Sequence, residues 1–325
     1  MIGSGTATIT DPDDYQASVA GACINLVLTG GGDFRARLTW VESPALRLFH
    51  FRETVPRINF VKFGPGTVAV AFPTKLKAPQ IWGSVTLAPR DLLLLGHGGS
   101  VHQRASGASQ WGLIVLAAEQ LAAYARALTG RDLVLPATTD ILKPPPAAAA
   151  SLLRLHAKAC RLAEAKPEIV VHREAVRALE HEMFHALINC LTTCAVYSRP
   201  ATRRHTNVMG RFEAVLSTER DRQISTPELC AGVGVSERTL RTCCVAVLGM
   251  SPGSYVRLRR LGHVRTALTR ADPATASIAE IARRHGFSEL GRFAAAYRMA
   301  FGEAPSITLR TAGARMFNRT TAEFA

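Results

Sequence analysis

The 325-residue sequence has no apolar run that approaches the roughly 18–20 residues of a membrane-spanning helix. Its N-terminus also lacks the charged segment and following apolar stretch of a secretory signal. A hydrophobic content of 47% with 20% charged residues is enough for a buried core and excludes wholesale disorder. We therefore expect a soluble, cytoplasmic protein of two domains that has no membrane partner.

The seven cysteines include no CxxC pair, so neither a disulfide framework nor a cysteine-bound metal is predicted. Glycine-rich nucleotide loops and the Gly-x-Ser-x-Gly element of serine hydrolases are missing as well. These absences remove the common signatures of a cofactor-dependent enzyme, and we expect no cofactor.

One string does match an enzyme motif. His181-Glu182-Met183-Phe184-His185 fits H-E-x-x-H, in which two histidines on one helical face bind zinc and the glutamate acts as general base. A third ligand would have to come from Glu213 or Glu219, in a segment that carries a different pattern. We interpret His181, Glu182 and His185 as the polar edge of an amphipathic helix and the chain as a non-enzyme, with a zinc hydrolase as the alternative.

Lysine is absent from residue 201 onward, where 19 arginines face 10 acidic residues and give a net charge of +9. The first 200 residues carry 20 basic and 15 acidic groups, a net charge of +5. Arginine can bind phosphate and the edge of guanine with two hydrogen bonds, so an arginine-rich C-terminal part suits duplex DNA.

The hydrophobic pattern of the first 197 residues changes once, from a strand-like to a helix-like period. Residues 33–116 contain short alternating segments of the kind found in a β-sandwich or small barrel, at 34–40, 46–51, 58–63, 67–72, 81–87, 91–95 and 111–116. Residues 117–197 are helical in pattern, with helices expected over 117–129, 147–165 and 168–197. The last of these has an apolar stripe that packs either on its own β-rich part or on another molecule in a homodimer: Ile169, Val176, Leu179, Met183, Leu187 and Leu191. We predict one domain over 15–197 and a linker over 198–206.

Residues 207–310 contain an internal repeat. A shift of 52 residues places Glu228-Leu229-Cys230-Ala231 on Glu280-Ile281-Ala282-Arg283, and Gly234-Val235-Ser236-Glu237 on Gly286-Phe287-Ser288-Glu289. Each copy predicts two helices separated by a glycine turn, with caps at Ser225 or Thr226 and at Ser236 in the first copy, and at Ser277 and Ser288 in the second. A continuous helix over 251–269 would fix the spacing between the copies.

The second helix of each copy is the expected DNA reader, because the first turns of a recognition helix reach base edges in the major groove. The predicted DNA contacts are Ser236, Glu237, Arg238, Arg241 and Thr242 in the first copy, and Ser288, Glu289, Leu290 and Arg292 in the second. Arg259, on the connecting helix, is predicted to contact phosphate.

The segment resembles the DNA-binding domain of the AraC/XylS family of bacterial transcription regulators. The matching stretches are Val233–Leu240, Leu248-Gly249-Met250-Ser251-Pro252, Ile278–Ala282, His285–Ser288 and Phe301–Ser306. The resemblance implies two helix-turn-helix units, binding to double-stranded promoter DNA and contact with RNA polymerase. In the first copy the sequence departs from the family at Thr242 and Cys244, where an arginine and an aromatic are usual.

The N-terminal half is similar, more loosely, to the cupin-like sensor of such regulators. Trp82-Gly83 and Leu87–Leu95 carry this similarity, which implies that a small-molecule effector binds there, with His102, Arg104 and Trp111 as candidate effector-binding or packing residues. His97 and His102 lack the His-x-His and glutamate context of a metal cupin, so no metal is expected. The fold class is then α+β: a β-rich cupin-like barrel or sandwich with a helical extension, an all-α DNA-binding domain over 207–310 and a tail over 311–325.

Overall fold

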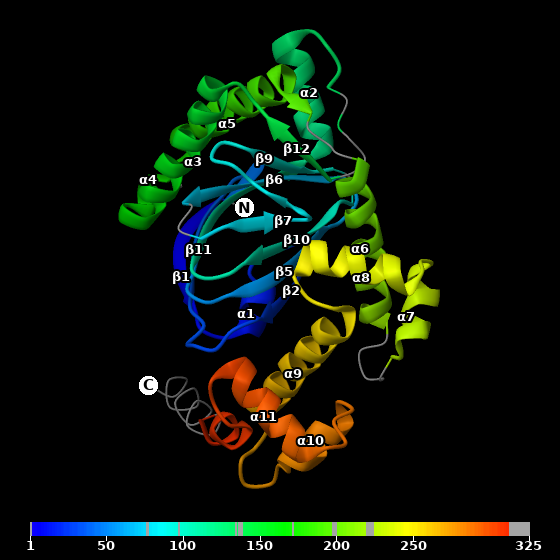
Figure 1. Cartoon of the computed structure of the whole chain (residues 1–325). Helices are drawn as coiled ribbons and strands as arrows, with labels where there is room; N and C mark the ends of the chain where they lie inside the picture. The colour runs from blue at the N-terminus through cyan, green and yellow to red at the C-terminus, as the bar shows by residue number, and fades with distance from the viewer. Residues whose placement is uncertain are drawn as a thin grey trace. The chain divides into compact units, whose positions relative to one another are not determined.

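The computed structural model describes residues 2–75, 78–96, 98–133, 135, 139–170, 172–196, 200–218 and 224–311. The chain forms two compact units (Figure 1). The N-terminal unit takes in most residues up to Asn207, and the C-terminal unit takes in Val208 onward together with Val27–Asp33 and Val55–Ile58. The first is β-rich with several helices and the second is mainly helical, as predicted. Among the described helices, none combines the length and hydropathy needed to cross a membrane.

Two antiparallel sheets organise the β-rich part. The larger sheet has the strand order β1 (Gly3–Ile9), β3 (Ala36–Glu42), β4 (Leu46–Glu53), β11 (Ser109–Ala117), β6 (Thr67–Lys75), β9 (Leu92–Leu95), β12 (Thr139–Lys143) and β13 (Ala195–Val196). The smaller sheet has the order β2 (Ala22–Leu28), β5 (Arg57–Phe63), β10 (Ser100–Ala105), β7 (Gln80–Trp82) and β8 (Val85–Thr86). Neither sheet closes on itself in the described residues, so the expected barrel is wrong and the open two-sheet alternative holds.

Strand β11 lies at the centre of the larger sheet. Ile114 pairs with Leu48 of β4 on one side and with Val70 of β6 on the other. Because side chains alternate along a strand, Ile114 and Trp111 point to opposite faces. Trp111 meets Trp82 of the smaller sheet edge-to-face, with ring centroids 5.6 Å apart. The smaller sheet therefore packs on that face, and helices cover the other.

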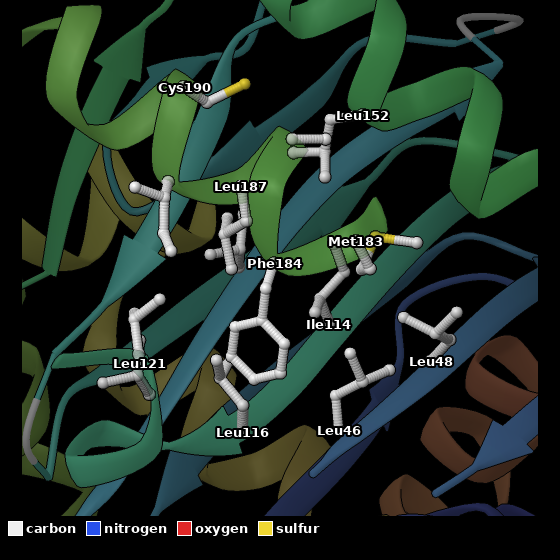
Figure 2. Packing of buried hydrophobic residues seen from close by; sticks show 14 of the residues in the cluster. Leu46, Leu48, Ile114, Leu116, Leu121, Leu152, Met183, Phe184, Leu187 and Cys190 are labelled. Atoms are coloured by element: carbon white, nitrogen blue, oxygen red, sulfur yellow. The ribbon is translucent and has the colours of Figure 1, made fainter. Parts of the chain in front are cut away.

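The helical layer of the N-terminal unit consists of α2 (Ala118–Thr129), α3 (Pro146–Ala165), α4 (Pro167–Val170) and α5 (Arg173–Thr193), while α1 (Pro12–Gln16) joins β1 to β2. Figure 2 shows leucines and isoleucine of β4 and β11 meeting side chains from α2, α3 and α5 in one apolar core. From the predicted stripe, Met183 and Leu187 are buried in this core, and Leu179 and Leu191 pack partly against it. Val176 of the same helix is also buried, with 3% exposure. The stripe is thus covered by its own domain, and the homodimer stays a prediction.

Several elements differ from the expectation. Strand β1 pairs with β3 along its whole length although it precedes the predicted domain start at residue 15. Its sequence, GSGTATI, is small and polar and shows no apolar alternation, which is why periodicity missed it. Strands β2, β10 and β12 were also not predicted, and the expected helix over 168–197 divides into α4 and α5 and ends at Thr193.

The remaining helices are α6 (Pro200–Thr218), α7 (Thr226–Val233), α8 (Glu237–Leu248), α9 (Pro252–Arg270), α10 (Ile278–Arg284) and α11 (Leu290–Phe301). The described part of the predicted linker, residues 200–206, is the first part of α6. Arg203 donates there to both carboxylate oxygens of Asp140 in β12, at 3.1 and 3.2 Å. Residues 198 and 199, His97, Glu219 and residues 312–325 of the predicted tail lie outside the described residues.

Candidate nucleic-acid interface

The helix caps of the C-terminal unit follow the sequence signals. Ser225 caps α7 in a reciprocal capping box with Glu228, whose carboxylate accepts from the Ser225 amide at 2.8 Å. The Ser236 hydroxyl accepts from the amide of Thr239 at the start of α8, and that of Ser277 accepts from Glu280 at the start of α10. Gly234 and Gly286 have φ angles of 69° and 75°, the left-handed conformation that the predicted turns require.

Each copy of the repeat has a small core that fixes the angle of its second helix. In the first copy, Leu229, Leu240 and Val247 are buried and Val235 packs against them. In the second, Phe293 stands 5.1 Å from Phe287 and 5.7 Å from Tyr297, ring centroid to ring centroid. The Tyr297 hydroxyl donates to Thr308 at 2.9 Å.

The outer face of α8 presents the predicted contacts to solvent. Glu237, Arg238, Arg241 and Thr242 are all exposed, while the Ser236 hydroxyl is used as the cap. Val245, one turn further along, is 52% exposed and was not among the predicted contacts. Val245 could have been predicted from the sequence, because a residue three positions after Thr242 lies beside it on the same face of the helix.

The second reader begins one residue later than predicted. Helix α11 starts at Leu290, with Glu289 rather than Ser288 at its N-cap and no capping hydrogen bond from a side chain. The second copy has one more residue than the first between this turn and the core of its second helix. When Leu240 is aligned with Phe293, the capping Ser236 therefore corresponds to Glu289 rather than to Ser288. Ser288 and Glu289 are exposed and Leu290 is half-buried. Arg292 is exposed and forms an ion pair with Glu289 at 3.0 Å.

The prediction that Arg259 contacts phosphate is wrong. Its side chain is only 7% exposed, and its guanidinium forms a short ion pair with Glu213, itself 1% exposed. The Tyr255 hydroxyl donates to the other oxygen of the same carboxylate at 2.6 Å. Burial, followed by the charge of Glu213, raises the pKa of Tyr255 well above its usual range. Sequence position placed Arg259 on α9 but could not show that it faces α6.

Two further arginines of α9 also serve the fold. Arg260 donates to the His285 carbonyl at 2.8 Å and lies over the Phe287 ring at 4.7 Å, which ties α9 to the turn of the second copy. Burial lowers the pKa of Arg260. Arg265 lies 4.9 Å from the centroid of the Phe301 ring and 3.5 Å from Glu303. Of the arginines on the first three turns of α9, Arg257 is the exposed one.

Comparisons with known proteins find matches over part of the chain. A family model described as a helix-turn-helix domain matches residues 229–311. The crystal structure of a probable AraC family transcriptional regulator from Rhodopseudomonas palustris CGA009 is 34% identical and covers 33% of this chain and 97% of that chain, with a TM-score of 0.30. The C-terminal unit therefore carries a helix-turn-helix domain of the AraC/XylS type.

Curated relatives match over part of the chain. The probable thc operon regulatory protein of Rhodococcus erythropolis is 38% identical over 96 residues, which are 30% of this chain and 29% of the relative. The XylDLEGF operon transcriptional activator of Pseudomonas putida is 43% identical over 89 residues, which are 27% of this chain and 28% of the relative. The matches thus span less than a third of these AraC/XylS relatives.

The residues predicted to bind an effector do not share one face. Trp111 is buried between the sheets, stacks on Phe51 at 4.1 Å and donates to Glu53 at 3.2 Å. His102, in β10, is buried against Phe60, with ring centroids 4.9 Å apart. Gln103 pairs with Trp82 in register, so Gln103 shares the inner face with Trp82, whereas His102 and Arg104 lie on the opposite face. Only Trp111 of the three faces the space between the sheets.

Sequence reasoning missed two polar groups on that inner face. Phe60 contacts His102 on the outer face, so its neighbour Asn59 in β5 points inward. The Asn59 side chain is 0% exposed, and neither its amide nitrogen nor its oxygen has a hydrogen-bond partner among the described residues. The indole nitrogen of Trp82, 1% exposed, likewise has no partner in the part of the chain that the structure describes. Buried polar atoms are normally hydrogen-bonded, so each of these needs an explanation.

The H-E-x-x-H string lies on α5, as predicted. His181, Glu182 and His185 are exposed, while Met183 and Phe184 between them are buried in the apolar core. Glu213, one of the suggested third ligands, is bonded to Arg259 and Tyr255. No cluster of three potential metal ligands occurs within the described ranges. The three residues therefore have the placement of a solvated helix edge.

Proposed function

We propose that this chain is a cytoplasmic transcription regulator that binds promoter DNA through the outer faces of α8 and α11 and responds to a small-molecule effector. The observation that carries the proposal is the duplicated helix-turn-helix arrangement, in which each second helix is held by a small core and exposes arginine. Arg238 and Arg241 serve the first reader, and Arg292 serves the second. Contact with RNA polymerase is proposed on the family resemblance.

The connection between the readers supports binding to one face of a duplex. Helix α9 has 19 residues, which at about 1.5 Å per residue corresponds to a rod of about 28 Å. Arg259 fixes one part of this rod to α6 and Arg260 fixes another to the turn before Phe287. Two readers held at a set separation can enter successive major-groove segments, which recur about every 34 Å.

The DNA-binding part is tested by fluorescence anisotropy of the full chain. Duplexes enriched from a random pool are compared with base-shuffled duplexes over a series of salt concentrations. The proposal predicts tighter binding to the enriched duplex and a steep loss of affinity with salt, because arginine contacts to phosphate release counterions. Equal affinity for both duplexes at every salt concentration would contradict it.

The effector is proposed to bind between the two sheets of the N-terminal unit. Asn59 offers a donor and an acceptor there, and Trp82 offers a donor, which no atom of the described residues uses. The rings of Trp82 and Trp111, which also face the space between the sheets, supply flat apolar surface. This combination suits a small uncharged molecule with an aromatic ring and a hydrogen-bonding group. Binding would shift the population of DNA-binding states by its differential affinity for them.

The test compares Asn59→Leu with the exposed control Asn189→Leu in a thermal-shift screen of such uncharged aromatic compounds. We expect Asn59→Leu to keep or raise the melting temperature of the free protein, because an unsatisfied buried amide is removed. Stabilisation by compounds should disappear in that variant and persist in the control. A stabilising compound that acts equally on both variants would show that the site lies elsewhere.

A further inference from the structure

The exposed face of α8 is not uniformly polar. Thr242 donates its hydroxyl to the carbonyl of Arg238, one turn earlier, at 2.8 Å. Since the hydroxyl is satisfied by its own helix, the part of this exposed side chain that is left to meet another surface is its methyl group. Thr242 therefore presents apolar surface where the family usually has an arginine.

Val245 extends this apolar surface. It lies three residues beyond Thr242, so the two side chains are neighbours on the helix face. Val245 is 52% exposed, whereas Val247 of the same helix is 1% exposed in the small core. The exposed side chain thus contributes little to folding, and Arg238 and Arg241 are exposed beside it on the same helix.

We propose that Thr242 and Val245 recognise the 5-methyl groups of thymine in the half of the operator that α8 reads. This rests on the proposed DNA-binding function and names its specificity. The C5-methyl is the apolar group that the bases present in the major groove, and apolar side chains mark it. The neighbouring Arg238 and Arg241 can bind phosphates and the edges of guanine. They therefore indicate that DNA, rather than an apolar protein surface, covers this face of α8.

The second copy supplies an internal comparison. With Leu240 aligned on Phe293, Thr242 and Val245 correspond to Ala295 and Arg298 of α11. The second reader lacks the valine and replaces it with a charged side chain. Thymine methyl recognition of this kind is therefore assigned to one half of the operator.

The experiment uses the full chain and duplexes enriched from a random pool. Each thymine is replaced singly by deoxyuridine, which removes only the methyl group, and the dissociation constant is measured by anisotropy. The half-site of α8 is assigned as the positions where Arg238→Ala relaxes base preference. There, one or two replacements should weaken wild-type binding roughly threefold to fivefold, the effect of losing contact with one buried methyl-sized group.

Three variants test whether the loss of affinity for deoxyuridine duplexes depends on Thr242 and Val245. Val245→Ala and Thr242→Ser should remove the penalty at those positions while they bind the deoxyuridine duplex like the wild type. Met299→Ala, which truncates the 82% exposed methionine of α11, should keep the penalty. The inference is overturned if no thymine in that half matters, if none is enriched there, or if Val245→Ala and Thr242→Ser keep the full penalty.

The same data separate this inference from the proposed function. If the pool yields no enriched duplex, sequence-specific binding itself fails, and the inference fails with it. If enriched duplexes bind selectively but deoxyuridine has no effect in the α8 half, the regulator stands and only the methyl reading is lost. Because Val245 is exposed, we expect the Val245→Ala variant to fold, and circular dichroism checks this.

Discussion

The guanidinium of Arg259 in α9 and the carboxylate of Glu213 in α6 form an ion pair that is buried inside the C-terminal unit. Tyr255 completes the arrangement with a hydrogen bond to the same carboxylate. Removing one member of a buried pair leaves the other charge without compensation. This pair therefore connects the first helix of the unit to the rod that holds the two readers.

Replacing Arg259 should affect folding more than DNA contact. Arg259→Ala is expected to lower the free energy of unfolding by about 3–5 kcal/mol. Arg257→Ala, the same change at an exposed position of the same helix, should stay within about 0.5 kcal/mol. Urea unfolding followed by circular dichroism measures both. The opposite result would be an Arg259→Ala protein that has wild-type stability but binds all DNA more weakly. That result would support the phosphate contact expected from the sequence.

The two turn glycines should differ in their tolerance of alanine. Both have positive φ, which costs about 1–2 kcal/mol for alanine. At Gly234 the nearest atom to an added Cβ is 3.7 Å away, so this strain is the whole cost. At Gly286 the Cβ would overlap the Arg260 guanidinium and displace it from the His285 carbonyl. Gly286→Ala should thus lower the unfolding free energy by more than Gly234→Ala, and equal losses in urea unfolding would refute the contact.

The N-terminal unit should lose stability as the pH falls below 6.5. Burial, reinforced by the nearby His50, lowers the pKa of His156 to about 3, and burial followed by Arg52 lowers that of His50 to about 4. Below pH 6.5 the unfolded chain takes up protons that the folded chain refuses, so stability declines toward the folded pKa values. Each such group contributes a slope of about 1.4 kcal/mol per pH unit.

The three tryptophans all lie in the N-terminal unit, so their fluorescence reports its unfolding in urea between pH 6.5 and 5. His156→Gln keeps an N–H that can donate to the Phe49 carbonyl, now 3.0 Å from the histidine nitrogen. We expect this variant to show a shallower pH dependence than the wild type. The exposed control His181→Gln should not, and identical slopes for all three proteins would exclude the buried histidine as the cause.

Arg292 is the sharpest test of the second reader. Its ion pair with Glu289 is exposed and therefore weak, so DNA can compete for the guanidinium. Arg292→Ala should reduce discrimination between the enriched and shuffled duplexes by about 1–3 kcal/mol. Arg257→Ala removes the same charge outside both readers and should lower affinity for both duplexes alike or not at all. Unchanged discrimination in Arg292→Ala would remove α11 from base recognition.

Local signals explain why the C-terminal unit was largely predictable. Ser225, Ser236 and Ser277 cap helices by contacts three residues away, and Gly234 marks a turn by its own backbone angle. Ser288 failed as a cap because one inserted residue moved the start of α11. Arg259 is buried because it pairs with Glu213, which is distant in the sequence, and no short-range pattern reveals such a pair.

The N-terminal unit shows the opposite case. Strand β1 is held by pairing with β3, and β10 is polar in sequence yet buried, so neither shows the alternation that marks a half-buried strand. Likewise, the inward direction of Asn59 follows from the contact of Phe60 with His102 and from the pairing of β10 with β7. Such residues become candidates only when their neighbours from distant parts of the chain are known.

We propose that one chain reads two segments of a duplex at a separation set by α9. The direct measurement inserts five base pairs between the two halves of an enriched duplex, about half a helical turn. We expect the full chain to bind this duplex only as tightly as a duplex that keeps a single half-site, because α9 cannot follow the rotated groove. Unchanged affinity after the insertion would contradict it.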